Sequence, residues 1–237
     1  MQTRAHYERA VRHVTMVAVA VPLLCIAVPP ASATSQGPLS PGTLASDNSY
    51  GTVAWTSPGF ATASDNAYAS TTNTPTATYY LKATNFGFSI PSGATINGII
   101  ADTEVKNGAG VECVDNRVRI VKGGTIGTTD KSLGGTWGTT DVTRSHGTST
   151  DLWGETWTTT DINASNFGFV IAATFSSASC TPFVDLMSVT VHYTSGSVPE
   201  LSTWAMLILF AVAAFAMHRE GLIVPGFIRS GIYGEER

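Results

Sequence analysis

The sequence predicts an all-β protein, an antiparallel β-sandwich of jelly-roll type followed by one C-terminal transmembrane or sorting helix. Short stretches of alternating apolar and polar residues recur through residues 51–195, and none of them keeps a helical period. Polar turn residues separate these stretches at short intervals, and threonine, which favours pleated strands, is abundant throughout. We therefore expect this region to form a sandwich of many short strands.

The chain begins with the features of an export signal at residues 1–33. A basic start precedes an uncharged apolar run of about 15 residues, which is short for a membrane span of roughly 20. Small residues follow at the position that signal peptidase requires. We expect cleavage after residue 33, and an uncleaved N-terminal anchor is the alternative. The basic residues are Arg4, Arg9 and Arg12, the apolar run is Val14 to Val28, and the small residues are Ala31, Ser32 and Ala33.

The residues after the signal divide into a short lead-in and a domain. Residues 34–50 are rich in serine, proline and glycine, and we expect them to be flexible. The region 34–197 is long enough for one domain with a real core. It holds seven basic and twelve acidic residues, a net charge of −5, and no cluster of lysine and arginine. We expect no nucleic-acid partner, because neutralising phosphates requires clustered cations.

Four strands stand out in order along the domain. The clearest is 94–106, where apolar or small side chains at 99, 101, 103 and 105 alternate with Ile100, Asp102, Glu104 and Lys106. The second is 116–122, with Val118 and Ile120 inward and Arg117 and Arg119 outward. The segments 167–175 and 187–193 predict two further strands, and the last of these closes the domain.

Three pairs of segments resemble each other within the domain. Residues 83–90 resemble 164–171, residues 45–50 resemble 63–68, and residues 136–142 resemble 156–162. The three offsets differ, so the chain is not a solenoid. We expect the similar segments to form equivalent strands in two facing sheets, with similar residues at the strand edges. In the shared Asn-Phe-Gly-Phe sequence, glycine lets the backbone turn or approach closely.

Two cysteines remain once the signal is removed, Cys113 and Cys180. An even pair in an oxidising compartment predicts a disulfide, and two unpaired buried thiols are the alternative. The bridge would close a loop of roughly 67 residues and contribute on the order of 3–4 kcal/mol by the loop-entropy model.

Tryptophans in polar loops give the most specific functional hypothesis, which is carbohydrate binding. Flat aromatic faces stack on the C–H faces of sugars, and neighbouring polar side chains supply directional hydrogen bonds. The candidates are Trp137, Trp153 and Trp157, in segments rich in glycine, threonine and aspartate. The alternative is that these indoles fill the core, and Trp55 is expected to do so.

Metal binding and catalysis leave weaker signals. Asp47, Asp65 and Asp115 each precede an asparagine and offer the hard oxygen ligands of a structural Ca²⁺ site, although Asx turns explain the same pairs. We expect no other cofactor. His192 is expected to be solvated on the outward face of the closing strand, and His146 to lie in a polar loop. No nucleophile elbow occurs, and the glutamates at 104, 112 and 155 leave a glycosidase as an alternative only. We therefore expect a protein that is not an enzyme.

The composition changes sharply after residue 195. Residues 196–219 contain a short linker and then Val198-Pro199-Glu200. An uncharged apolar stretch follows from Leu201 to Met217, with Trp204 near its start, and His218-Arg219 comes directly after it. Seventeen helical residues span roughly 25 Å, the short end for a bilayer core. The basic end marks the cytoplasmic flank. Residues 220–237 form a short tail.

This C-terminal segment resembles the PEP-CTERM sorting signal of exported proteins of Gram-negative bacteria. The resemblance rests on Val198, Pro199, Glu200, Trp204 and Arg219, with Leu201 where the family has a second proline. It implies an exosortase as the processing partner and a context of exopolysaccharide or biofilm production. An ordinary C-terminal anchor is the alternative. The domain itself resembles an uncharacterised threonine- and glycine-rich bacterial surface β module through residues 80–88 and 118–124.

We therefore expect an exported protein that is anchored transiently in the inner membrane and then reaches the cell surface or the extracellular space. Its expected role is non-enzymatic, in the extracellular matrix, with extracellular polysaccharide as the partner. The first alternative is a purely structural or adhesive surface module, and the second is a carbohydrate-active enzyme.

Overall fold

The computed structural model describes residues 31–71, 76–108, 112–175, 180–196, 208–212 and 215. The segment Pro29–Val198 forms one compact unit. Outside this unit, the described positions 208–212 and 215 are helical. The described part of the chain contains no helix of the length and hydropathy that a membrane crossing needs. The predicted export signal (except residues 31–33) and most of the predicted sorting signal, including Val198 to Trp204 and Arg219, lie outside the described residues.

Ten strands form two antiparallel sheets in the described residues, so the all-β prediction is confirmed. Sheet A has the order β1-β10-β5-β8, with β3 beside β10, and sheet B has the order β2-β4-β9-β6-β7. In sheet A the strands are β1 (Ala33–Leu39), β3 (Ala69–Ser70), β5 (Thr95–Asn107), β8 (Val142–Thr148) and β10 (Pro182–Thr194). In sheet B they are β2 (Thr43–Asp47), β4 (Tyr80–Thr84), β6 (Cys113–Lys122), β7 (Thr125–Ile126) and β9 (Gly168–Phe175). Two short helices, η1 (Pro58–Phe60) and α1 (Thr159–Asn163), lie in the connections.

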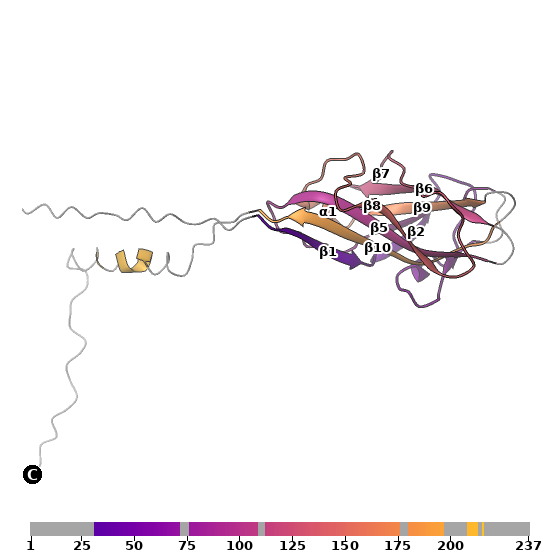
Figure 1. The fold of residues 1–237 in the computed structure, drawn as a ribbon, viewed down its shortest axis with the longest axis horizontal. Coiled ribbons are helices and arrows are strands. Elements are labelled where there is room, and N and C mark those ends of the chain that lie inside the picture. Colours follow the sequence, from indigo (N-terminus) through magenta and orange to yellow (C-terminus); the bar gives the residue numbers. More distant parts are fainter. Residues whose placement is uncertain are drawn as a thin grey trace, which may run out of the picture. The chain divides into compact units, whose positions relative to one another are not determined.

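The chain passes from one sheet to the other at nearly every connection, and β6–β7 is a hairpin within sheet B. Figure 1 shows the result, with β6 and β7 on one side of the sandwich and β1 on the other. The two longest strands, β5 and β10, have 13 residues each and pair at the centre of sheet A. The first and last strands of the domain, β1 and β10, are neighbours.

The core lies between the two sheets because each strand turns alternate side chains inward. In β5 the predicted alternation is confirmed, since residues 99, 101, 103 and 105 are buried while their neighbours are partly exposed. Strand β6 follows the same rule, with Val118 and Ile120 buried. One continuous apolar cluster joins the inner faces, including Ile99, Val105 and Val189 of sheet A and Leu81, Ile120 and Phe169 of sheet B.

The prediction of a flexible lead-in at residues 34–50 is wrong. This segment contains most of β1 and all of β2, which pair with β10 and β4. Both are edge strands whose side chains are exposed or only partly buried, so they carry no clear apolar alternation that a sequence pattern could reveal. An edge strand tolerates the glycine and proline at 37 and 38, because part of its backbone has no ladder partner.

The resembling segments 83–90 and 164–171 lie side by side in one sheet, so the expectation that they belong to facing sheets is wrong. Strands β4 and β9 are antiparallel neighbours in sheet B, with Thr84 opposite Gly168. The two copies of Asn-Phe-Gly-Phe pack their rings on each other, with centroids 6.2 Å apart for Phe86 and Phe169 and 5.8 Å apart for Phe88 and Phe167. The repeat therefore builds one aromatic cluster of the core.

Candidate functional site

The tryptophans predicted to bind sugar are directed into the protein. Trp137 is 2% exposed and Trp153 is 1% exposed, so neither can stack on a ligand, and this part of the carbohydrate hypothesis is wrong. Their indole N–H groups donate inside the domain, to Oδ1 of Asp115 at 2.7 Å and to the carbonyl oxygen of Ile99 at 2.9 Å. Trp55 is buried as expected. Loop position alone does not expose a large ring, because burying it stabilises the loop against the core.

Trp157 is partly buried, and its indole N–H already has a partner inside the domain. Its N–H donates to the carbonyl oxygen of Leu152 at 2.9 Å. Phe167 packs edge-on at a centroid distance of 5.4 Å, and Nζ of Lys122 lies 5.5 Å from the ring centroid. These contacts leave Trp157 as part of the packing at one edge of the core.

Asp47 and Asp65 form Asx turns. The carboxylate of Asp47 accepts from the backbone N–H of Ser49 at 3.0 Å, and that of Asp65 accepts from Ala67 at 2.9 Å. Asp47 also lies 3.4 Å from Nζ of Lys82. Burial opposes ionisation of Asp47, but these hydrogen bonds and the lysine charge outweigh it and lower its pKa. The structure does not bring Asp47, Asp65 and Asp115 together, and the described residues contain no group of three metal-binding side chains.

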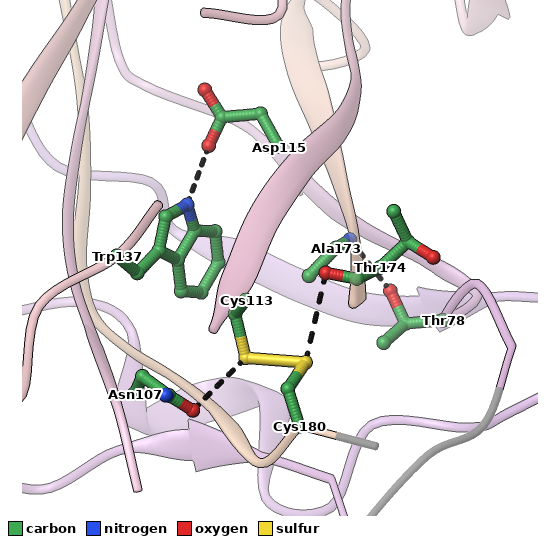
Figure 2. Close-up of a disulfide and its surroundings, with 8 residues drawn as sticks. All are labelled: Thr78, Asn107, Cys113, Asp115, Trp137, Ala173, Thr174 and Cys180. Carbon is green, nitrogen blue, oxygen red and sulfur yellow. Dashed lines mark hydrogen bonds between the residues drawn. A yellow bond between two sulfur atoms is a disulfide. The ribbon is translucent and has the colours of Figure 1, made fainter. Parts of the chain in front are cut away.

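Asp115 is the centre of a buried polar network rather than a metal ligand. Its side chain is 0% exposed and forms an ion pair with Arg144, Nη2 to Oδ2, at 3.2 Å. It also accepts from the backbone N–H of Leu133 at 3.0 Å, besides the indole of Trp137. The network connects β6 in sheet B to β8 in sheet A, and Figure 2 shows Asp115 directed at the indole. Four hydrogen bonds, three of them to Oδ2, occupy most of the acceptor capacity of this carboxylate, and the charge of Arg144 already balances its charge.

Cys113 and Cys180 form the predicted disulfide. Their Cα atoms are 5.3 Å apart, within the usual range for a bridge. The bridge joins the start of β6 in sheet B to the segment just before β10 in sheet A, and Asn107 and Thr174 lie against its sulfur atoms (Figure 2). It closes the sandwich at this end.

His146 lies in strand β8, so the prediction of a polar loop at this position is wrong. The strand pairs with β5 and directs His146 inward, where it is 0% exposed. Its Nδ1 lies 3.0 Å from the carbonyl oxygen of Lys131, and its Nε2 lies 3.3 Å from Oγ1 of Thr103. The polar residues 143 and 145 on the solvent side hid the strand pattern, because a solvent-facing side needs no apolar residues.

An open depression of about 570 Å³ lies on sheet A where β1, β5 and β10 meet the turn after β8. Its volume is in the range of ligand sites. None of its seven lining residues carries a lysine, arginine, aspartate or glutamate side chain, and six of them offer a hydroxyl, amide or imidazole group. The lining is Ala33, Thr34, Ser35, Asn97, Ser149, Thr150 and His192.

His192 is the distinctive residue of this depression. It is on the outward face as predicted, but it is only partly exposed, so the prediction of a solvated side chain is wrong. Its Nε2 is shielded from solvent and has no hydrogen-bond partner among the described residues. A buried polar atom without a partner costs about 1–3 kcal/mol.

The backbone register explains how these residues meet. His192 lies between Ser35 of β1 and Gly98 of β5 in the same row across the sheet. A Cβ at Gly98 would lie 2.3 Å from the carbonyl carbon of Ser149, so a glycine is required for the turn after β8 to cross the sheet here. Four segments distant in sequence form this site, so no local pattern marks it, and its one sequence signal is Gly98 within the clearest predicted strand.

The acidic residues of the glycosidase alternative are placed apart. Glu155 lines a smaller depression of about 290 Å³ with Lys122, Thr125 and Thr128, whereas Glu104 lies on the outer face of sheet A. Glu112 is exposed. The two depressions have no lining residue in common.

Comparisons of the chain with protein-family models, with curated protein sequences and with solved structures found no match.

Proposed function

We propose that the chain is an exported, non-enzymatic β-sandwich protein of the extracellular matrix that binds neutral exopolysaccharide in the depression around His192. The observation that supports the proposal is the uncharged polar lining of this depression, to which His192 and Asn97 contribute. Hydroxyl, amide and imidazole groups both donate and accept hydrogen bonds, as sugar hydroxyls do. An ionic ligand would instead be expected to meet opposite charge.

The proposal extends to topology and location. The alternation of strands between two antiparallel sheets supports a jelly-roll type. The composition of residues 1–33 and of Leu201 to Met217 supports export followed by a C-terminal anchoring helix, with an exosortase-type enzyme as processing partner. In this arrangement the depression faces the extracellular space.

Binding can be measured with the unit Pro29–Val198, which contains both sheets, the core and the disulfide. Titration calorimetry with soluble dextran, galactomannan and polygalacturonate is expected to show binding to a neutral polymer and none to the acidic one. His192→Ala and Asn97→Ala are expected to weaken that binding at least about tenfold, which corresponds to one lost hydrogen bond of about 1.4 kcal/mol.

Thr143→Ala is the matched control, since Thr143 is an exposed hydroxyl residue on β8 outside the depression. Binding that is equally strong in the His192→Ala and Asn97→Ala variants would refute this site. Absence of binding to every neutral polymer would instead favour the alternative of a purely structural or adhesive module, which the burial of Trp137 and Trp153 also supports.

A further inference from the structure

Two of the seven cationic side chains of the domain differ from the other five. Lys82, Lys106, Lys122, Lys131 and Arg144 each form an ion pair with an aspartate. Among the described residues no carboxylate lies within ion-pair distance of Arg117 or Arg119. Because the domain carries a surplus of acidic groups, two unpaired arginines are a feature that needs an explanation.

The two arginines lie on the same surface, the outer face of sheet B. Arg117 is opposite Ala172, and Arg119 is opposite Val170, on the neighbouring strand β9. Ala172 and Val170 belong to a small apolar cluster on this face, separate from the main core. The arginines therefore stand at alternate positions of β6, roughly 6.8 Å apart along the strand.

Both arginine side chains are partly buried against the protein. The guanidinium carbon of Arg117 lies 3.9 Å from the ring centroid of Tyr50. The pKa of Arg117 is raised chiefly by Tyr80, with smaller effects of Tyr50 and of the charge of Asp130. Nε of Arg119 is shielded from solvent and has no hydrogen-bond partner among the described residues. A partner that binds partly buried arginines loses less side-chain entropy, and a carboxylate would offset the desolvation of the charge.

The outer face of sheet A carries the complementary pattern. Asp102 and Glu104 occupy alternate positions on the outward side of β5, with the same spacing as the arginines. Asp102 accepts a hydrogen bond from Ser145, and within the described residues no lysine or arginine forms an ion pair with either carboxylate. Both side chains are partly exposed.

We propose that the outer face of sheet B binds the outer face of sheet A of a second copy of this chain, with Arg117 and Arg119 opposite the second copy's Asp102 and Glu104. The acidic partner is thus present in the molecule itself. Pairing of two sheet B faces would place like charges together and is disfavoured. The two faces lie on opposite sides of the sandwich, so a pair of copies still has one free sheet A face and one free sheet B face, and the contact continues as an open stack.

Such a contact is weak between dilute molecules, because exposed ion pairs contribute little individually. Copies anchored to the same surface have a high effective concentration, which favours the stack there. The stack would let a surface-anchored protein form fibres or a coat. This inference does not depend on His192 or on polysaccharide binding.

Sedimentation velocity of the unit Pro29–Val198 at increasing concentration tests the proposal. The wild type is expected to form progressively larger species at low salt and to dissociate at high salt, where charges are screened. Arg117→Gln with Arg119→Gln, and separately Asp102→Asn with Glu104→Gln, are each expected to be monomeric. An equal mixture of the two variants is expected to form a dimer and nothing larger. The arginine variant keeps its acidic sheet A face, the other variant keeps its basic sheet B face, and these two faces can form only one contact.

The control is Lys122→Gln with Lys131→Gln, which changes the net charge equally but removes cations that are already paired, and it is expected to stack like the wild type. Near-ultraviolet circular dichroism checks that each variant is folded. The two double variants change different sheets, so a folding defect in one of them would leave the other as an independent test. A wild type that remains monomeric at all concentrations and low salt, or a mixture that fails to dimerise, would overturn the proposal. A monomeric wild type that binds polygalacturonate through the arginines would assign this face to acidic polysaccharide instead.

Discussion

His146 shows how one buried residue connects the fold to pH. Burial lowers the pKa of its imidazole, and the positive charge of Arg144 acts in the same direction, while the carbonyl of Lys131 and the charges of Asp115 and Asp102 oppose the shift. The carbonyl oxygen of Lys131 can only accept, so Nδ1 carries the proton and Nε2 accepts from the hydroxyl of Thr103. The folded protein therefore keeps this histidine neutral.

The expected consequence is a loss of stability as the pH falls below about 6.5, the ordinary pKa of histidine. In this range the unfolded chain binds a proton at residue 146 that the folded chain does not, so the free energy of unfolding falls by up to about 1.4 kcal/mol per pH unit until the lowered pKa is reached. Urea unfolding between neutral pH and about pH 5 measures this slope.

In His146→Gln the part of the slope that comes from this histidine is expected to disappear, at the cost of lower stability at neutral pH. The lowered pKa values of Asp47, Asp151 and Asp161 act only nearer their ordinary value of 3.8, so they do not mask the effect. An unchanged slope in the variant would show that His146 is not the titrating group.

At the scale of elements, the repeated Asn-Phe-Gly-Phe sequence uses its two glycines for different reasons. Gly87 has a φ of +71°, and a Cβ there would meet nothing within 4 Å. Gly168 begins β9, and a Cβ there would lie 1.9 Å from the carbonyl oxygen of Ala83 on β4. The first glycine permits a turn, whereas the second permits close pairing of two strands.

This difference predicts unequal costs for the same substitution. Gly87→Ala is expected to lower the free energy of unfolding by about 1–2 kcal/mol, the cost of a left-handed conformation. Gly168→Ala is expected to cost about 3 kcal/mol or more, because the strands must separate to admit the methyl group. Chemical denaturation of the two variants beside the wild type provides the measurement. Equal costs would show that the β4–β9 approach is less tight than the structure indicates.

At the scale of the whole molecule, the sandwich is connected across its sheets by the disulfide and by the Asp115–Arg144 pair. The disulfide agrees with the export that residues 1–33 predict, because such a bridge persists in an oxidising compartment. The predicted cleavage site at Ala33 coincides with the first residue of β1, so the mature chain would begin directly in the sandwich.

Intact-mass analysis of the protein recovered from a Gram-negative host tests the export and sorting proposals together. We expect a chain that begins at Thr34, contains no thiol that reacts with iodoacetamide before reduction, and ends within or before the segment 198–219. Replacing Pro199 and Glu200 by alanine is expected to retain the chain in the membrane fraction. An intact N-terminus would refute signal cleavage. A full-length C-terminus in both the wild type and the variant would show that the segment 198–219 is an ordinary anchor and not a processed sorting signal.

The sequence by itself determined the all-β class, the central strands and the disulfide pair. Strands β5, β6 and β10 were predictable because one face meets the core and the other is partly exposed, which imposes an alternation with period two. Strand β9 was predictable as a short apolar run, since its residues 169–173 are all buried. The cysteines were predictable because only two remain after the signal. The alternation along a strand is a local pattern, and the disulfide follows from the number of cysteines, so neither prediction needs the positions of residues in space.

Tertiary structure decided which surfaces are available. The indoles of Trp137 and Trp153 are buried because loops fold back over the ends of the sheets, and no local pattern distinguishes a loop tryptophan that points inward from one that points outward. The edge strands β1 and β2 were missed because they bury few side chains, and their pairing is made by backbone groups that every residue carries. The depression around His192 and the opposed charges on the two outer faces arise only when strands distant in sequence are placed in register, because a site is defined by distances in space.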